Sequence, residues 1–119
     1  MGATYLTVKV CRTDKPKMCR TLRNVLVDTG SEISAIPAAV AKELGIDFPR
    51  RERFELGYGR IRTGPVGSAV FSIGRQSVTD DVAPGPATLG VTALEKLGFT
   101  VDPKTKTLRK NAKHALLRR

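Results

Sequence analysis

This sequence has few of the residues that form metal centres, cofactor sites or membrane spans. Its 119 residues contain no tryptophan, two cysteines and one histidine. A structural zinc site needs four closely spaced ligands, so Cys11, Cys19 and the distant His114 make a poor metal site. No apolar run reaches the roughly 18 residues that a transmembrane helix requires. The sequence therefore predicts no metal, no cofactor and no contact with a membrane.

The N-terminal segment and the cysteines predict a cytoplasmic protein with free thiols. Residues 1–10 alternate like a strand and lack the apolar stretch of a signal peptide. Cys11 and Cys19 flank a predicted loop and could face each other across a hairpin. Thiols stay reduced in the cytoplasm. We favour two unpaired strand cysteines over a functional pair.

Length and charge predict one folded domain followed by a basic tail. A chain of 119 residues is typical of a single domain, which we place at residues 1–108. The tail, residues 109–119, has five basic and no acidic side chains, half of the formal net charge of +10. Such a tail could contact nucleic acid. No aromatic residue is interleaved for base stacking, so we favour a solvated terminus.

Short alternating segments predict an all-β fold with two short helices. Aromatic residues make up only 5% of the chain, so aliphatic side chains must fill the core. We expect a polar connector at residues 48–53, and a helix capped by Thr92. Strands at this regular spacing are typical of a closed barrel or sandwich. The predicted strands are residues 6–10, 21–27, 34–36, 54–56, 66–73 and 76–83, and the predicted helices are residues 37–44 and 92–98.

Asp28 is the clearest candidate for chemistry. It ends the β-branched run at residues 25–27, which is typical of a buried strand. A carboxylate buried there without a partner would cost several kcal/mol. Two small residues, Thr29 and Gly30, follow it, and Ser31 comes next. A structural alternative is an aspartate that caps a loop in a non-catalytic β-domain.

Residues 25–37 resemble the active-site loop of aspartic peptidases. The shared pattern is an apolar run, Asp-Thr-Gly-Ser and a second apolar pair. Residues 87–98 resemble the apolar-apolar-Gly segment and short helix near the end of retropepsin-like domains, here with Thr88 where the family prefers an apolar residue. Residues 99–108 fit the closing hairpin of small prokaryotic members. The resemblance implies a retropepsin-like closed β-barrel with a flap hairpin.

The resemblance also implies a homodimer without cofactors. Only one Asp-Thr-Gly occurs, and neither Asp80-Asp81, in a predicted polar strand end, nor Asp102 has the Thr/Ser-Gly context of a catalytic aspartate. The second catalytic carboxylate would therefore be Asp28 of another copy, brought onto a twofold axis. Thr29 would reach across the dimer and Ser31 would bond the Asp28 carboxylate. Gly30 would let its amide approach that carboxylate.

Two further segments are expected to support the site. The family's flap would be formed by residues 57–60, which are Gly57, Tyr58, Gly59 and Arg60. Closure of such a hairpin excludes water and adds backbone hydrogen bonds to an extended peptide. Gly57 and Tyr58 depart from the family's usual flap residues, and a plain hairpin tip is the alternative. Leu89 and Gly90 are expected to pack beneath the Asp28 loop.

The function that the sequence supports best is an aspartic endopeptidase that cleaves polypeptides. The alternative is an inactive module with the same fold that binds peptides or nucleic acid. Intact Asp-Thr-Gly-Ser favours the enzyme, because a binding module gains nothing from two carboxylates crowded on an axis. Arg51, Arg53, Arg60 and Arg62 lie on or beside the predicted flap. These cations predict a preference for acidic substrates.

The pair of carboxylates predicts a bell-shaped dependence of rate on pH. Two neighbouring carboxyl groups cannot both ionise easily, so they share one proton, and the rate should be greatest between about pH 4 and 7. Initial rates of peptide cleavage across a pH series measure this. Activity that rises steadily above pH 8 would contradict it.

Overall fold

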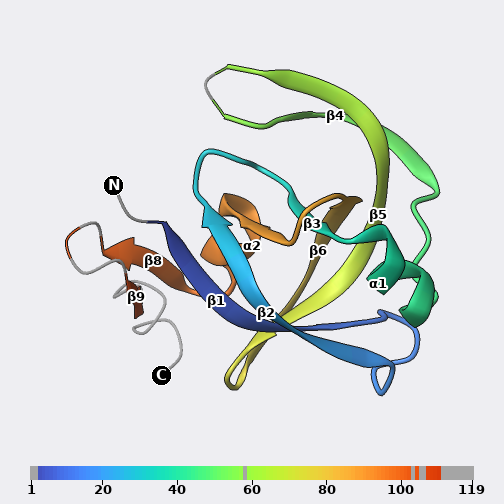
Figure 1. Ribbon diagram of the computed structural model, residues 1–119, viewed down its shortest axis with the longest axis horizontal. Helices are drawn as coiled ribbons and strands as arrows, with labels where there is room; N and C mark the ends of the chain where they lie inside the picture. Colours follow the sequence, from blue (N-terminus) through green and yellow to red (C-terminus); the bar gives the residue numbers. More distant parts are fainter. Residues whose placement is uncertain (1–2, 58, 103, 105–106, 111–119) are drawn as a thin grey trace.

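The computed structural model describes residues 3–57, 59–102, 104 and 107–110 (Figure 1). Tyr58, His114 and the predicted basic tail beyond Lys110 lie outside the described residues. The first two residues of that tail, Arg109 and Lys110, belong to the last described strand. No helix in the described part of the chain is long and apolar enough to cross a membrane.

A closed β-sheet forms the body of the protein, which confirms the predicted all-β class. Within the described residues it has seven strands in the order β1-β2-β7-β3-β6-β5-β4, and pairing of β1 with β5 closes the ring. Closure leaves few unpaired strand edges. The strands are β1 (Thr4–Cys11), β2 (Cys19–Asp28), β3 (Ser34–Ile36), β4 (Arg50–Glu55), β5 (Ile61–Ile73), β6 (Gln76–Pro84) and β7 (Thr88–Gly90).

Two short helices and a terminal hairpin complete the fold. Helix α1 (Ala38–Leu44) follows Pro37 and ends at Gly45, whose φ of 77° suits a glycine. Helix α2 (Val91–Lys96) starts directly after β7. The predicted cap by Thr92 is wrong, because Gly90 is the N-cap and makes no side-chain capping bond. The predicted closing hairpin is confirmed as β8 (Phe99–Asp102) and β9 (Thr107–Lys110).

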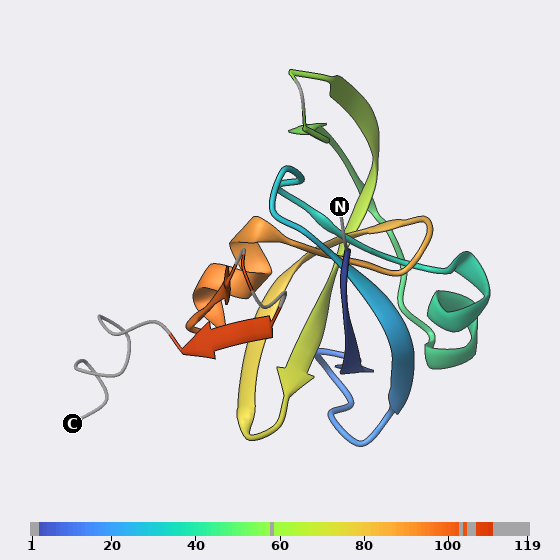
Figure 2. The same ribbon diagram turned by 60° about the vertical axis from the view of Figure 1, so that its left-hand side comes forward.

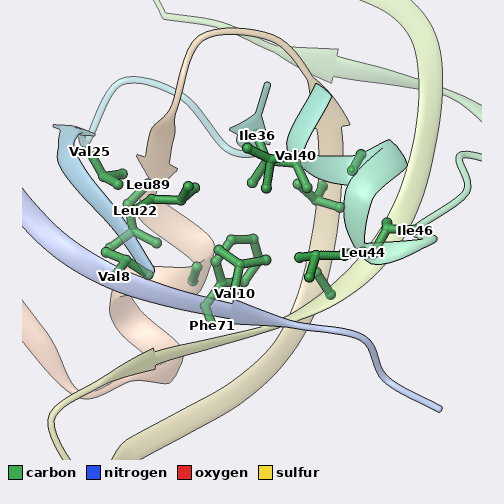
Figure 3. Packing of buried hydrophobic residues seen from close by; sticks show 14 of the residues in the cluster. Val8, Val10, Leu22, Val25, Ile36, Val40, Leu44, Ile46, Phe71 and Leu89 are labelled. Atoms are coloured by element: carbon green, nitrogen blue, oxygen red, sulfur yellow. The ribbon is translucent and has the colours of Figure 1, made fainter. Parts of the chain in front are cut away.

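Aliphatic side chains fill the interior, as the low aromatic content predicts. Phe71 is the one aromatic side chain in the fully enclosed part of the main core, and it is 2% exposed. Figure 3 shows that side chains from β1, β2, β3, β7 and α1 point toward one another around it. The labelled residues of this cluster are Val8, Val10, Leu22, Val25, Ile36, Val40, Leu44, Ile46, Phe71 and Leu89.

A β-bulge in β2 sets the direction of the strand that ends at Asp28. The register of β1 against β2 shifts between Leu6, which faces Val25, and Val8, which faces Leu22. The extra residue is accommodated at Asn24, which has a positive φ of 58°. Because of the shift, Leu22 and Val25 both enter the core although they are three residues apart. Simple alternation would place them on opposite faces.

The hairpin of β4 and β5 is longer than predicted. Residues 50–53 are part of β4 rather than a polar connector, and they pair with residues 63–66 of β5. Arg50 anchors the base of the hairpin by donating a 2.8 Å hydrogen bond to Asp81 of β6. This hydrogen bond raises the pKa of Arg50 above its ordinary value. The hairpin rises from this base and curves over the loop that joins β2 to β3 (Figures 1 and 2).

The acidic pair in β6 also differs from its predicted setting. Asp80 and Asp81 lie within a continuous strand, not at a polar strand end. Asp80 is only 8% exposed, and Lys96 of α2 donates to its carboxylate at 3.0 Å. An ion pair with one buried partner ties α2 to the barrel, since an unpaired buried carboxylate would be costly.

The prediction of unpaired cysteines is wrong in this structure. Cys11 and Cys19 are directly opposite each other at the end of the β1–β2 hairpin and form a disulfide. Spacing in the sequence left open whether they would face each other. Only the strand register decides that they do.

Reduction of this disulfide should lower stability moderately. The bond closes a loop between residues eight apart, and loop-closure entropy for such a ring is worth about 2–3 kcal/mol. Urea unfolding with and without a thiol reductant measures the difference in free energy of unfolding. A Cys11→Ala/Cys19→Ala variant is the control, and the reductant should not change its stability. An equal effect of the reductant on both proteins would contradict the assignment.

Candidate active site

Asp28 is held at the end of β2, where that strand leaves the sheet. Its backbone pairs with Gly90 of the parallel strand β7. The side chain is half-buried, and its Oδ1 accepts a hydrogen bond of 3.0 Å from the amide of Gly30. An amide donor stabilises an ionised carboxylate without adding a countercharge. The carboxylate is therefore fixed in orientation while it stays accessible.

The residues after Asp28 divide into an exposed part and a buried part. Thr29 and Gly30 are exposed, whereas Ser31 is 3% exposed. The expected hydrogen bond from Ser31 to Asp28 is replaced by another, because the Ser31 hydroxyl donates to the carbonyl oxygen of Ile33 at 2.9 Å. A hydroxyl has one proton to donate. Ser31 thus stabilises the turn of the loop rather than the carboxylate.

Strand β7 holds the loop from below. The amide of Gly90 donates to the hydroxyl of Ser34 at 2.9 Å, and the amide of Val91 donates to the carbonyl of Ser31 at 2.8 Å. Leu89 is fully buried. A Cβ atom on Gly90 would lie 2.7 Å from the carbonyl group of Ile33, closer than any real contact. The loop therefore requires glycine at this position.

Glu32 links the loop to α2 and to the hairpin above it. Its carbonyl accepts from the Thr92 hydroxyl at 2.9 Å. Its amide donates to the carbonyl of Glu55, and its carboxylate accepts from the Glu55 amide at 2.6 Å. Sequence reasoning did not assign a role to Glu32 or to Ser34. Their only signal was their position just after Asp-Thr-Gly-Ser, within the segment 25–37 that resembles the active-site loop.

The tip of the β4–β5 hairpin lies directly on the Asp28 loop. The amide of Leu56 donates to the carbonyl of Arg60 at 2.9 Å, which closes the turn. Gly57 and Gly59 have positive φ values of 99° and 74°. A Cβ on Gly57 would lie 3.2 Å from the carbonyl oxygen of Gly30. Gly57 on the hairpin and Gly30 on the loop thus allow the two backbones to touch.

A pocket of about 390 Å³ opens between the hairpin and the loop, with Asp28 in its wall. Much of the remaining wall is apolar, and two arginines of the hairpin, Arg60 and Arg62, also line it. Ile33, Phe54 and Ala83 of this wall belong to a small core cluster that Val66 completes and against which Leu56 packs. A volume of this size accommodates a few side chains of an extended peptide.

A model of the aspartyl protease family matches residues 19–89, from the start of β2 to β7. The chain belongs to the aspartyl protease family. The match covers the Asp28 loop and the hairpin, and the closed sheet with two short helices agrees with a retropepsin-like fold. No curated protein and no solved structure gave a significant match.

This aspartyl protease family member contributes one carboxylate to its pocket. Among the residues that the structure describes, Asp28 is the only acid in the pocket wall. The other candidates from the sequence are engaged elsewhere, since Asp80 pairs with Lys96 and Asp81 with Arg50. Asp102 lies at the end of β8 and outside this pocket. One chain therefore does not bring two aspartates together here.

Replacing Gly90 should disturb the whole loop. Gly90→Ala is expected to lower the free energy of unfolding by about 2–3 kcal/mol, because the new methyl group overlaps the backbone of residues 31 and 33. Urea unfolding measures this loss. Gly85→Ala is the control, since its Cβ would make only an ordinary 3.5 Å contact with Ala35. Equal losses in the two variants would contradict the proposed close packing.

Proposed function

We propose that this protein is an aspartic endopeptidase whose two catalytic carboxylates come from Asp28 of each subunit of a homodimer. The observation that carries the proposal is the single Asp28 carboxylate, oriented by the Gly30 amide in a pocket beneath a hairpin. Membership of the aspartyl protease family supports a protease. The dimer is needed because the described pocket wall has no second acid.

In the proposed mechanism one carboxylate is ionised and the other keeps a proton. The ionised carboxylate removes a proton from water, whose oxygen attacks the carbonyl carbon of the peptide bond. The protonated partner donates its proton to the carbonyl oxygen. Collapse of the resulting diol breaks the C–N bond as a proton passes to the leaving nitrogen. The shared proton suits both steps, since each step needs one acid and one base.

The hairpin would cover the substrate during this reaction. Its tip already lies on the backbone of Gly30, so an extended peptide would bind in the pocket between the hairpin and β7. Covering the peptide excludes water from all but the attacking position. Tyr58, the remaining residue of the expected flap, lies outside the described residues.

Apolar surface beside Asp28 supports a twofold contact. A second pocket of about 440 Å³ lies next to Thr29, between the start of β1 and β8. Val27, Phe99 and Val101 are half-buried in its wall. In an isologous dimer the same patch faces itself, so Thr29 and Asp28 of both copies would meet on the axis. Thr29 is exposed, so its hydroxyl would reach across.

The proposed location is the cytoplasm, where the Cys11–Cys19 bond would be open to reduction. Neither cysteine lines the pocket that contains Asp28. The proposed chemistry therefore does not depend on the oxidation state of the pair.

Asp28→Asn should abolish peptide cleavage and leave the dimer intact. The amide cannot act as a base, so the rate should fall by a factor on the order of 10³ or more. Cleavage of a peptide library and sedimentation at micromolar concentration measure the two properties. Asp47→Asn is the matched control, because Asp47 is exposed and outside the pocket, and it should stay active.

Two outcomes would overturn this assignment. Full activity of Asp28→Asn would exclude Asp28 as the catalytic group. A wild-type protein that is strictly monomeric could not assemble the pair of aspartates, and it would favour a binding module that keeps the fold without the chemistry.

A further inference from the structure

Two arginines in the wall of the Asp28 pocket have no acidic partner among the residues that the structure describes. Arg60 and Arg62 both line this pocket and are exposed to it. Within the described part of the chain, neither of them is within ion-pair distance of a carboxylate. Arg50, at the base of the same hairpin, contacts both Glu52 and Asp81. Acidic side chains thus neutralise Arg50 at the base of the hairpin, whereas Arg60 and Arg62 in the described pocket wall keep an uncompensated charge.

Strand alternation explains why Arg60 and Arg62 reach the pocket, whereas Arg51 and Arg53, also expected to act there, do not. Phe54 of β4 lies opposite Arg62 of β5, and both line the pocket. Neighbouring residues along a strand point to opposite faces. Arg53 accordingly lines a different pocket together with Asp80 and Asp81, and Arg51 does not line the Asp28 pocket. Of the four arginines expected to favour acidic substrates, only two therefore line the pocket that would bind the substrate.

The surroundings of Arg62 favour a carboxylate as its partner. Arg62 pairs across the hairpin with Phe54, whose side chain is buried, and the pocket wall also includes Leu56 and Pro65. A bound peptide would cover this side of the pocket and exclude water from it, so a charge-assisted hydrogen bond formed there would be stronger than one in open solvent. A guanidinium also matches a carboxylate with two parallel hydrogen bonds.

The balance of charge points the same way. In the proposed dimer the two Asp28 carboxyl groups share a proton and carry one negative charge. Because each pocket has Arg60 and Arg62 in its wall, the two copies would contribute four arginines to a shared cleft. The cleft therefore has an excess of positive charge that an acidic substrate side chain would balance.

We propose that Arg62, assisted by Arg60, makes this protein select polypeptide substrates with a glutamate or aspartate side chain close to the scissile bond. This inference rests on the proposed peptidase function. Arg62 is a specificity-determining residue in this proposal, because it contacts a substrate side chain and not the reacting atoms.

The test uses short peptides with a central Leu–Phe pair that carry Glu, Gln or Lys at each flanking position in turn. The wild-type protein should show a higher kcat/KM for Glu than for Gln at one or more positions. In Arg62→Gln this Glu-to-Gln ratio should fall by roughly fivefold to thirtyfold. In Arg62→Glu the preference should invert toward Lys. Raising the salt to about 1 M should weaken the wild-type preference, since the Debye length falls to about 3 Å.

Arg53→Gln is the matched control. It makes the same change of charge on the same hairpin, outside the Asp28 pocket, and it should keep the wild-type ratio. An unchanged ratio in Arg62→Gln would overturn the inference. So would an equal fall in Arg53→Gln, which would indicate a general effect of net charge.

Failure of the peptidase assignment can be separated from failure of this inference. Absence of any cleavage, or cleavage that survives Asp28→Asn, would refute the proposed function alone. In that case the inference is tested by binding: fluorescence anisotropy measures the affinity of the protein for labelled Glu and Gln peptides. Tighter binding of the Glu peptide that is lost in Arg62→Gln supports it, and equal binding of both peptides by the wild-type protein overturns it.

Discussion

The contact between Gly90 and the Asp28 loop is the constraint on which the site depends. Because Gly90 has no side chain, the backbone of residues 31–33 lies directly against it. The hydroxyl oxygen of Ser34 accepts a hydrogen bond from the Gly90 amide. Strand β7 pairs at the same place with β2, which ends at Asp28. The position of the carboxylate is thus set by backbone contacts within the closed sheet. Side-chain flexibility contributes little to it.

The hairpin above the loop is held to the body of the protein at two places. Its base is held to β6 through Arg50 and Asp81, and its upper part is held to the loop through Glu32 and Glu55. Between these anchors, Phe54 closes a small apolar cluster, and Arg62 remains available to a ligand. An anchored base and a free inner face are what a cover over a bound peptide requires.

Local patterns in the sequence were sufficient for much of the fold. Alternation predicted most strands, and Pro37 with Gly45 predicted α1, because these signals act over a few residues. The predictions failed where contacts with segments distant in the sequence decide the local structure. The bulge at Asn24 depends on the register with β1, the N-cap of α2 depends on Gly90 lying on the loop, and the length of β4 depends on its pairing with β5. Thr92 has a clear capping pattern, yet its hydroxyl bonds Glu32 instead.

The sequence by itself determined the family and the all-β class, and it singled out Asp28 as the candidate for chemistry, since an apolar run that ends in Asp-Thr-Gly-Ser is a local feature of the chain. Only the tertiary structure decided how that residue is surrounded. It directed Ser31 to Ile33 rather than to Asp28, joined Cys11 to Cys19, and brought Arg62 into the pocket while excluding Arg53. The physical reason is the strand register, because a shift of one residue reverses which side chains face the pocket.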